Sequence, residues 1–261
     1  MKIIEVQFAP WDKHYWFDPE NHPLKVGDYV IVKTELGIEM GQVVGLKEIE
    51  TSPADRKIKP ILRKATLSDI EKVEQRKDHS QKDIVVCKKL AAKHELPIKI
   101  VDVHYSFDGG RITFAFTASG RIDFRELVKD LTHHYQKSIR LHQIGVRDEA
   151  KYKGQIGPCN KPLCCRSFLD KLEQVNSEFA ETQQIEHRGS DRLTGVCGRL
   201  KCCLRYEQDL YENLSQKLPA IGSSIRTPSG RGKVIAWHTL KQTIDVALDN
   251  DPNTIIEVEI K

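Results

Sequence analysis

The chain has 261 residues, of which 30% are charged and 39% are hydrophobic. This composition is typical of a soluble globular protein, and the length suffices for one large domain or two to three small ones. No apolar run approaches the roughly 18–20 residues that span a bilayer, and the start of the chain lacks the apolar stretch of a signal peptide. We therefore expect a cytoplasmic protein. The net charge of +4 permits contact with nucleic acid without requiring it.

The two ends of the chain predict small β-barrels of the SH3 type. Within residues 1–60, the stretch from Leu24 to Glu50 alternates apolar and polar residues and is punctuated by glycines. Residues 219–261 have the same character, with turn sequences at Thr227–Gly230 and Asp249–Pro252.

Residues 61–150 open with a helix signal. Ser68 and Glu71 fit a capping box, in which each side chain satisfies the other's backbone N–H. We expect a helix from there towards His94, with a break near residues 79–80.

A hairpin, a second helix and a strand follow in this region. Residues 108–110 (Asp-Gly-Gly) predict the hairpin turn. Asp123 and Glu126 fit a second capping box, and residues 138–146 predict a strand. The resulting order α-β-β-α-β indicates an α+β fold, an antiparallel sheet with helices on one face.

Residues 151–210 hold a duplicated cysteine motif. The sequences GPCNKPLCC, from Gly157, and GVCGRLKCC, from Gly195, contain six of the seven cysteines. Their common pattern is G-x-C-x-[KR]-x-x-C-C-x-x-[FY], which ends at Phe168 and Tyr206. Structural disulfides are rare in the cytoplasm, so clustered cysteines indicate metal binding or redox activity.

Thiolates bind zinc and iron–sulfur clusters alike. Three functional interpretations stay open: one four-sulfur site with two cysteines left over as core, a cluster at each triplet with a fourth ligand from elsewhere, or a reversible dithiol switch. The alternative is that the cysteines are small buried apolar side chains. The four-sulfur site would use Cys159, Cys164, Cys197 and Cys202, and would leave Cys165 and Cys203.

Other residues carry weaker signals. Cys87 sits alone among apolar residues on an expected helix, which favours core packing. Adjacent histidines such as His133 and His134 cannot share one helix face. The spacing singles out no histidine as a fourth ligand among His104, His142 and His187.

Basic residues surround the second cysteine triplet. They are interpreted as contacts for an acidic partner or for phosphates, or else as a solvated face, and they are Arg192, Arg199, Lys201 and Arg205. The chain has no P-loop, no dinucleotide-binding glycine motif and no nucleophile elbow. We therefore expect a protein that is not an enzyme.

The segments DFRELVKDL, QIGVRDEAK, GQIGPCNKPLCC and GVCGRLKCCLRYE resemble the bacterial PSP1-type C-terminal domain family. The resemblance runs from about Lys25 to Glu207 and continues loosely into the last predicted barrel. Two positions depart from the pattern: Asn160 stands where glycine is expected and Lys201 where methionine is expected. Asparagine can still adopt a left-handed turn.

The resemblance implies a cytoplasmic regulator that works with two small helical partner proteins. It implies a complex that carries iron–sulfur clusters, of the 4Fe–4S type, with all six motif cysteines as their ligands. It further implies that the complex adapts a ribonuclease in mRNA processing and affects sporulation. The rival interpretations are a structural zinc protein that binds RNA directly through its barrels, and a metal-free thiol redox sensor.

Overall fold

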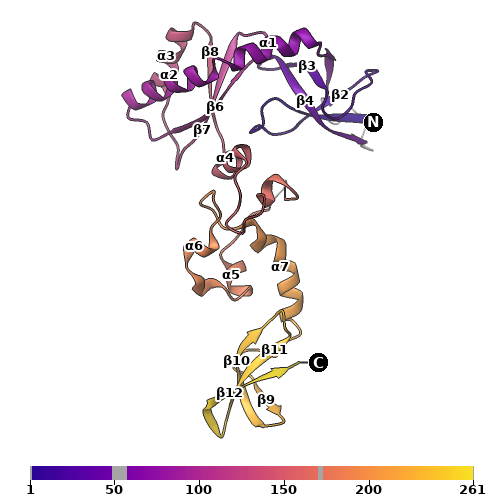
Figure 1. Ribbon diagram of the computed structural model, residues 1–261, viewed down its shortest axis with the longest axis vertical. Coiled ribbons are helices and arrows are strands. Elements are labelled where there is room, and N and C mark those ends of the chain that lie inside the picture. Colours follow the sequence, from indigo (N-terminus) through magenta and orange to yellow (C-terminus); the bar gives the residue numbers. More distant parts are fainter. Residues whose placement is uncertain (1, 49–57, 170–172, 261) are drawn as a thin grey trace. The chain divides into compact units, whose positions relative to one another are not determined.

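The protein is described here by a computed structural model that covers residues 2–48, 58–169 and 173–260. The chain divides into two compact units, Met1–Lys153 and Gly154–Lys261, and each is described by itself (Figure 1). Among the helices of the described ranges, none is long and apolar enough to cross a membrane.

The first unit begins with five strands that close into a barrel in the order β1-β2-β5-β3-β4. Buried aliphatic side chains such as Ile4, Val30 and Val43 fill its interior. The closed barrel agrees with the prediction for this end, although its last strand runs past the predicted boundary at residue 60. The strands are β1 (Lys2–Gln7), β2 (Tyr15–Asp18), β3 (Tyr29–Thr34), β4 (Gly37–Glu48) and β5 (Lys59–Lys64).

A three-stranded sheet with helices completes the first unit, in the predicted order α-β-β-α-β. The sheet order is β6-β7-β8, with β6 and β7 antiparallel but β7 and β8 parallel. The predicted wholly antiparallel sheet is therefore wrong. Helix α3 carries the chain back to the end of the sheet at which β7 begins, so that β8 runs parallel to β7. The elements are α1 (Leu67–Lys77), α2 (Ser80–Lys93), β6 (Lys99–Tyr105), β7 (Arg111–Thr117), α3 (Arg125–Tyr135), β8 (Ser138–Gln143) and α4 (Val146–Lys153).

The two faces of this sheet differ in character. On one face α2 and α3 cover an apolar cluster that includes Phe114, Leu127 and Cys87. Cys87 is fully buried there, as predicted, and burial raises the pKa of its thiol to about 12. On the other face Ala115 packs with Trp11, from the loop after β1.

The helix starts differ from the predicted ones, and both predicted capping boxes, at 68–71 and 123–126, are wrong. Helix α1 is capped by Thr66, whose side chain accepts a hydrogen bond from the N–H of Asp69. An arginine of β5 binds the Asp69 carboxylate and so selects this register. Before α3, the Asp123 carboxylate accepts a hydrogen bond from the backbone N–H of Arg125, but no capping box forms with Glu126. The predicted break near residues 79–80 and the hairpin turn at 108–110 are both present.

The second unit begins with short helical elements and ends in a sheet. The last four strands form an antiparallel sheet in the order β12-β11-β10-β9, and among the described residues β9 does not pair with β12. The barrel predicted here is therefore wrong, because Leu218, from the segment after α7, covers the apolar face of the open sheet. The elements are η2 (Cys164–Arg166), α5 (Glu178–Thr182), η3 (Glu186–Arg188), α6 (Ser190–Leu193), α7 (Cys202–Ser215), β9 (Ser224–Thr227), β10 (Gly230–His238), β11 (Thr243–Leu248) and β12 (Asp251–Glu259).

Candidate metal centre

The first copy of the cysteine motif folds into a tight loop. The N–H of Gly157 donates to the carbonyl oxygen of Lys161 at 2.9 Å, and the N–H of Asn160 donates to the carbonyl oxygen of Gly157 at 2.9 Å. Ile156 and Pro162 form an isolated antiparallel bridge at the base of the loop.

The second copy repeats this backbone arrangement bond for bond. The N–H of Gly195 donates to the carbonyl oxygen of Arg199 at 2.8 Å, and the N–H of Gly198 donates to the carbonyl oxygen of Gly195 at 2.9 Å. Thr194 and Leu200 form the matching bridge. The duplication in sequence is therefore also a duplication of local structure.

Each loop turns on one residue with left-handed backbone conformation. These are Asn160, with φ of 58°, and Gly198, with φ of 73°, and each directly follows the first cysteine of its motif. Glycine and asparagine are the residues that adopt this conformation most readily. Asparagine in place of the expected glycine at position 160 therefore preserves the turn of the loop.

The chain beyond the two loops differs. After the first loop, Cys164 and Cys165 lie in a single 3-10 turn. After the second, Cys202 and Cys203 start the 14-residue helix α7. The unpaired N–H groups at a helix start favour negative charge, which suits a thiolate.

The two copies lie against each other within the second unit. The rings of Phe168 and Tyr206, the equivalent last residues of the motif, meet edge to face with centroids 5.1 Å apart. Burial, followed by the charges of Glu207 and Cys164, raises the pKa of the Cys203 thiol. Cys164 of one copy is therefore close enough to Cys203 of the other to influence its ionisation.

The six motif cysteines form no disulfide within the described ranges, and their exposure runs from buried (Cys165) to exposed (Cys159). Within residues 2–48, 58–169 and 173–260, no group of three or more His, Cys, Asp or Glu side chains is positioned to hold a metal ion. The chemistry of the donor set nevertheless fits zinc or an iron–sulfur cluster, because six thiols stand on two matched loops. Bound iron–sulfur would supply a redox-active group and a crosslink between the loops.

The histidines have different surroundings. His104 lies 3.0 Å from Glu39 through its Nε2 atom, and His142 stacks near Trp11. Both belong to the first unit, as do His133 and His134, which are exposed on α3. The remaining candidate, His187, is exposed in η3 of the second unit.

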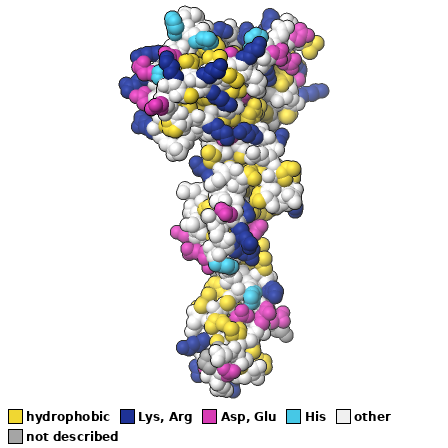
Figure 2. Space-filling view, turned by 60° about the vertical axis from the view of Figure 1, so that its left-hand side comes forward, with side chains coloured by type: hydrophobic (Ala, Val, Ile, Leu, Met, Phe, Trp, Pro, Cys, Tyr) yellow, Lys and Arg dark blue, Asp and Glu magenta, His cyan; other side chains and the backbone are white. Residues whose placement is uncertain are grey.

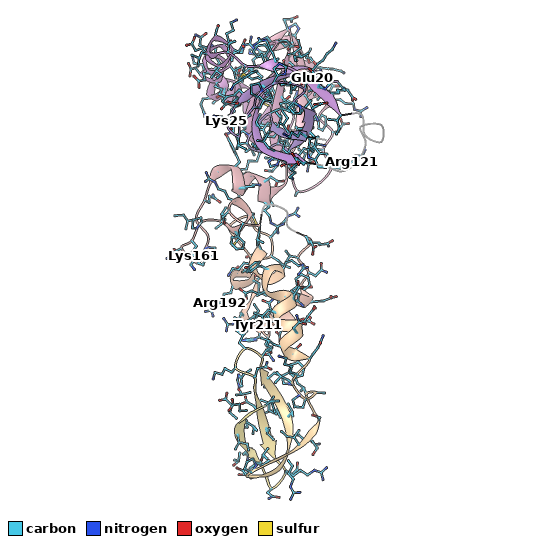
Figure 3. All side chains as sticks on the ribbon, turned by 90° about the vertical axis from the view of Figure 1, so that its right-hand side faces the viewer. Glu20, Lys25, Arg121, Lys161, Arg192 and Tyr211 are labelled. Atoms are coloured by element: carbon cyan, nitrogen blue, oxygen red, sulfur yellow. The ribbon has the colours of Figure 1, made fainter. Side chains whose placement is uncertain are left out.

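The basic residues around the second triplet differ in whether their side chains form ion pairs or hydrogen bonds with other residues or are exposed. Arg205 forms ion pairs with Glu173 at 2.7 Å and with Asp209 at 2.9 Å. The Lys201 ammonium donates to the carbonyl oxygen of Arg192. The side chains of Arg192 and Arg199 are exposed, and Figure 3 shows Arg192 projecting from the ribbon.

The comparisons with known proteins agree with this architecture. The family described as "PSP1 C-terminal conserved region" matches residues 59–144, and the family described as "PSP1-like protein, third domain" matches residues 174–218. These ranges cover the sheet with its helices, and the helices around the second cysteine loop. No solved structure matches the chain.

Two curated relatives place the chain further. It is 40% identical over 254 residues, 97% of this chain and 92% of the relative, to the Bacillus subtilis protein called stage 0 sporulation protein YaaT. It is also 27% identical over 165 residues to an uncharacterised Schizosaccharomyces pombe protein, covering 52% of this chain and 22% of that one. The chain belongs to the PSP1 family, and within it is a homologue of YaaT.

Sequence reasoning missed a cleft in the first unit. Its lining includes Trp11, Tyr15 and Trp16. The signal in the sequence was the density of aromatic residues between Phe8 and Phe17, which is higher than elsewhere in the chain.

Proposed function

We propose that this chain is a non-enzymatic, cytoplasmic regulatory adaptor that binds an iron–sulfur cluster through its two cysteine motifs. The observation that carries the proposal is the repeated loop, in which one backbone turn occurs twice and is followed each time by two cysteines. Cysteine thiolates are the usual ligands of 4Fe–4S clusters, and each cluster takes four of them. Cys159 and Cys197 are the first cysteine of each motif, and the loops hold them in equivalent positions.

The packing of the cysteine segment, residues 154–207, supports a bound metal. The described chain has four clusters of buried hydrophobic residues, and none of them takes a member from this segment. A segment without a hydrophobic cluster needs another source of stability, and metal binding supplies it in small cysteine-rich domains.

Ligand arithmetic supports a multi-protein complex. A cubane cluster takes four cysteines, so six thiols complete one cluster but not two. The seventh, Cys87, is fully buried in the other unit. A second cluster would therefore need ligands from a partner.

Exposed apolar side chains near the loops support partner docking. Ile156, Phe168, Tyr206 and Leu210 are each more than half exposed, at 64%, 61%, 60% and 53%. Figure 2 shows hydrophobic side chains at the surface of this unit. Tyr206 and Leu210 lie one turn apart on α7 and so share a face. We propose small helical proteins as the partners, with the exposed Arg192 and Arg199 meeting their acidic residues.

The biological setting follows from the relative and from the family resemblance. The Bacillus subtilis relative is named for stage 0 of sporulation. We propose that this chain acts in developmental regulation of that kind, through a complex that influences mRNA processing by a ribonuclease.

The decisive experiment is purification without oxygen, followed by iron, sulfide and zinc analysis. We expect brown protein with iron and acid-labile sulfide in near-equal amounts. Stoichiometric zinc without sulfide would instead support a structural zinc protein that binds RNA directly. Neither metal, with a reversible Cys164–Cys203 disulfide, would support a thiol redox sensor.

The partner proposal has its own test. We expect at most one stable cluster in the isolated chain and a second one only in a complex co-purified with a partner. Two fully occupied four-iron clusters in the isolated chain, ligated by its own cysteines, would contradict it. We also expect the chain to have no catalytic activity of its own. Hydrolysis of RNA or nucleotide that a single side-chain substitution abolishes would contradict this expectation.

A further inference from the structure

The first unit contains a cleft of about 350 Å³ between the barrel and the sheet. This volume lies within the roughly 300–1,000 Å³ of typical small-molecule sites. Its walls are joined by specific contacts: the Trp11 indole N–H donates to Asp102 at 2.7 Å, and His104 pairs with Glu39 at 3.0 Å. The cleft is therefore held open by the fold itself.

The floor of the cleft is a row of polar residues across the sheet. His104 pairs with Thr113, and Thr113 pairs with Arg140, so all three stand on one face. The next residue along each strand points to the other face, so that Phe114, which follows Thr113, faces the helix-covered side of the sheet. A sheet face that lies against another element is ordinarily apolar, because burying polar groups is costly. The polar row is thus poorly suited to plain packing and well suited to a ligand.

Aromatic rings form the opposite wall. Tyr15 and Phe17 come from the same face of β2, and the Tyr15 ring is close enough to Arg140 for that charge to affect its pKa. Such rings provide flat, partly dry surfaces on which a planar group can stack.

Two cations in the cleft lack an acidic partner. The neighbouring Lys59 pairs with Glu35 at 3.8 Å, whereas across the described ranges neither Lys33 nor Arg140 has a salt bridge. Lys33 is exposed, and Arg140 is half-buried close to His142. An open positive charge beside aromatic rings attracts an anion that also carries a planar ring.

We propose that this cleft binds a nucleotide unit, with the base against the β2 aromatic rings and the phosphate near Lys33 and Arg140. The mixed lining disfavours a purely apolar ligand, and the unpaired cations disfavour a metal ion. The site lies entirely within the first unit and does not depend on the metal centre. The nucleotide unit has two sources, a free mononucleotide and one residue of a single-stranded RNA.

The experiment measures binding to the full-length protein. Calorimetric titrations use adenosine and uridine monophosphates, with ribose 5-phosphate as the probe that has a phosphate but no base. Anisotropy titrations use a fluorescent oligouridylate and a competing double-stranded RNA. Binding of a mononucleotide but not of ribose 5-phosphate supports a free nucleotide as the ligand. Binding of the single strand alone supports RNA as the source.

Matched variants locate the site. Tyr15→Leu should weaken binding about 5- to 150-fold, which corresponds to about 1–3 kcal/mol of base stacking. Tyr15→Phe keeps a ring and should retain most of the affinity. Arg140→Gln should weaken binding about tenfold or more. Arg121→Gln, an exposed arginine outside the cleft, is its control and should leave binding unchanged.

Several outcomes would overturn the proposal. One is equal affinity for ribose 5-phosphate and mononucleotides, because the base would then not be bound. Another is binding that Tyr15→Leu and Arg140→Gln leave unchanged while both variants remain folded by circular dichroism. The third is no binding of either probe.

Discussion

The sheet of residues 99–143 and the cysteine segment of residues 154–207 differ in how many apolar side chains they bury. The sheet buries Phe114 and Phe116 almost completely, together with side chains from two helices. The cysteine segment contributes no residue to a hydrophobic cluster in the described ranges, and its loops are held by backbone hydrogen bonds. Burial of apolar surface stabilises the first region, and we propose that the second, which buries only a few apolar side chains such as Leu204, relies on a bound metal or a partner.

The largest expected effect comes from replacing the first cysteine of either loop. Cys159→Ser and Cys197→Ser should each remove metal binding, which in small sites supplies on the order of 10 kcal/mol of folding free energy. We expect the cysteine segment to lose protection against hydrogen exchange while the sheet keeps it, and chelation should do the same. Cys87→Ala serves as the control and should leave the metal content unchanged. Intact protection of the segment in both loop variants would show that the metal does not stabilise it.

The converse change is made in the sheet. Phe114→Ala should destabilise the first unit by about 3–5 kcal/mol, because it leaves a cavity in a fully buried cluster. Denaturant unfolding gives this value, and metal per chain should stay at the wild-type level. Val85→Ala, at a half-exposed position of α2, should change stability far less. Loss of metal in Phe114→Ala would mean that the two regions are not independent.

A smaller effect should come from the turn of the second loop. Gly198 has φ of 73° and open space where a Cβ would stand, so Gly198→Ala adds only backbone strain. That strain costs about 1–2 kcal/mol and should weaken metal binding. Asn160→Gly, at the equivalent position, should be neutral or slightly favourable. Gly195→Ala, where a Cβ meets only ordinary contacts, is the matched control. Equal metal affinity in all three variants would argue against a role for the left-handed turn.

The smallest effect lies outside both regions, at the start of α1. The Arg63 guanidinium, and then the N–H of Thr66, lower the pKa of Asp69. Its stabilisation is therefore present above the unfolded pKa of about 4 and is lost as the pH falls below it. Asp69→Asn should cost about 1 kcal/mol at neutral pH.

The pH series and a neighbouring variant complete this test. The difference between wild type and Asp69→Asn should shrink in acid, as measured by thermal unfolding. Glu71→Gln, at the position that the sequence suggested for the cap, should change stability by less than about 0.5 kcal/mol. A larger loss in Glu71→Gln than in Asp69→Asn would reverse the assignment of the cap.

Much of the fold could be predicted because its signals are local. The order of the elements, the hairpin turn at 108–110 and the burial of Cys87 follow from periodicity and turn residues over short windows. The open C-terminal sheet could not, because whether strands close into a barrel depends on what covers their apolar face. Here Leu218 does so, from outside the strands.

The two matched cysteine loops are encoded locally in the amino-acid sequence. Their geometry depends on residues within the motif, since Asn160 or Gly198 turns the chain and hydrogen bonds close it locally. By contrast, the contact of the two copies through Phe168 and Tyr206, and the set of residues that line the cleft of the first unit, depend on tertiary packing. Those features join residues far apart in the chain, such as Trp11 and Asp102, and no short window of sequence contains both partners.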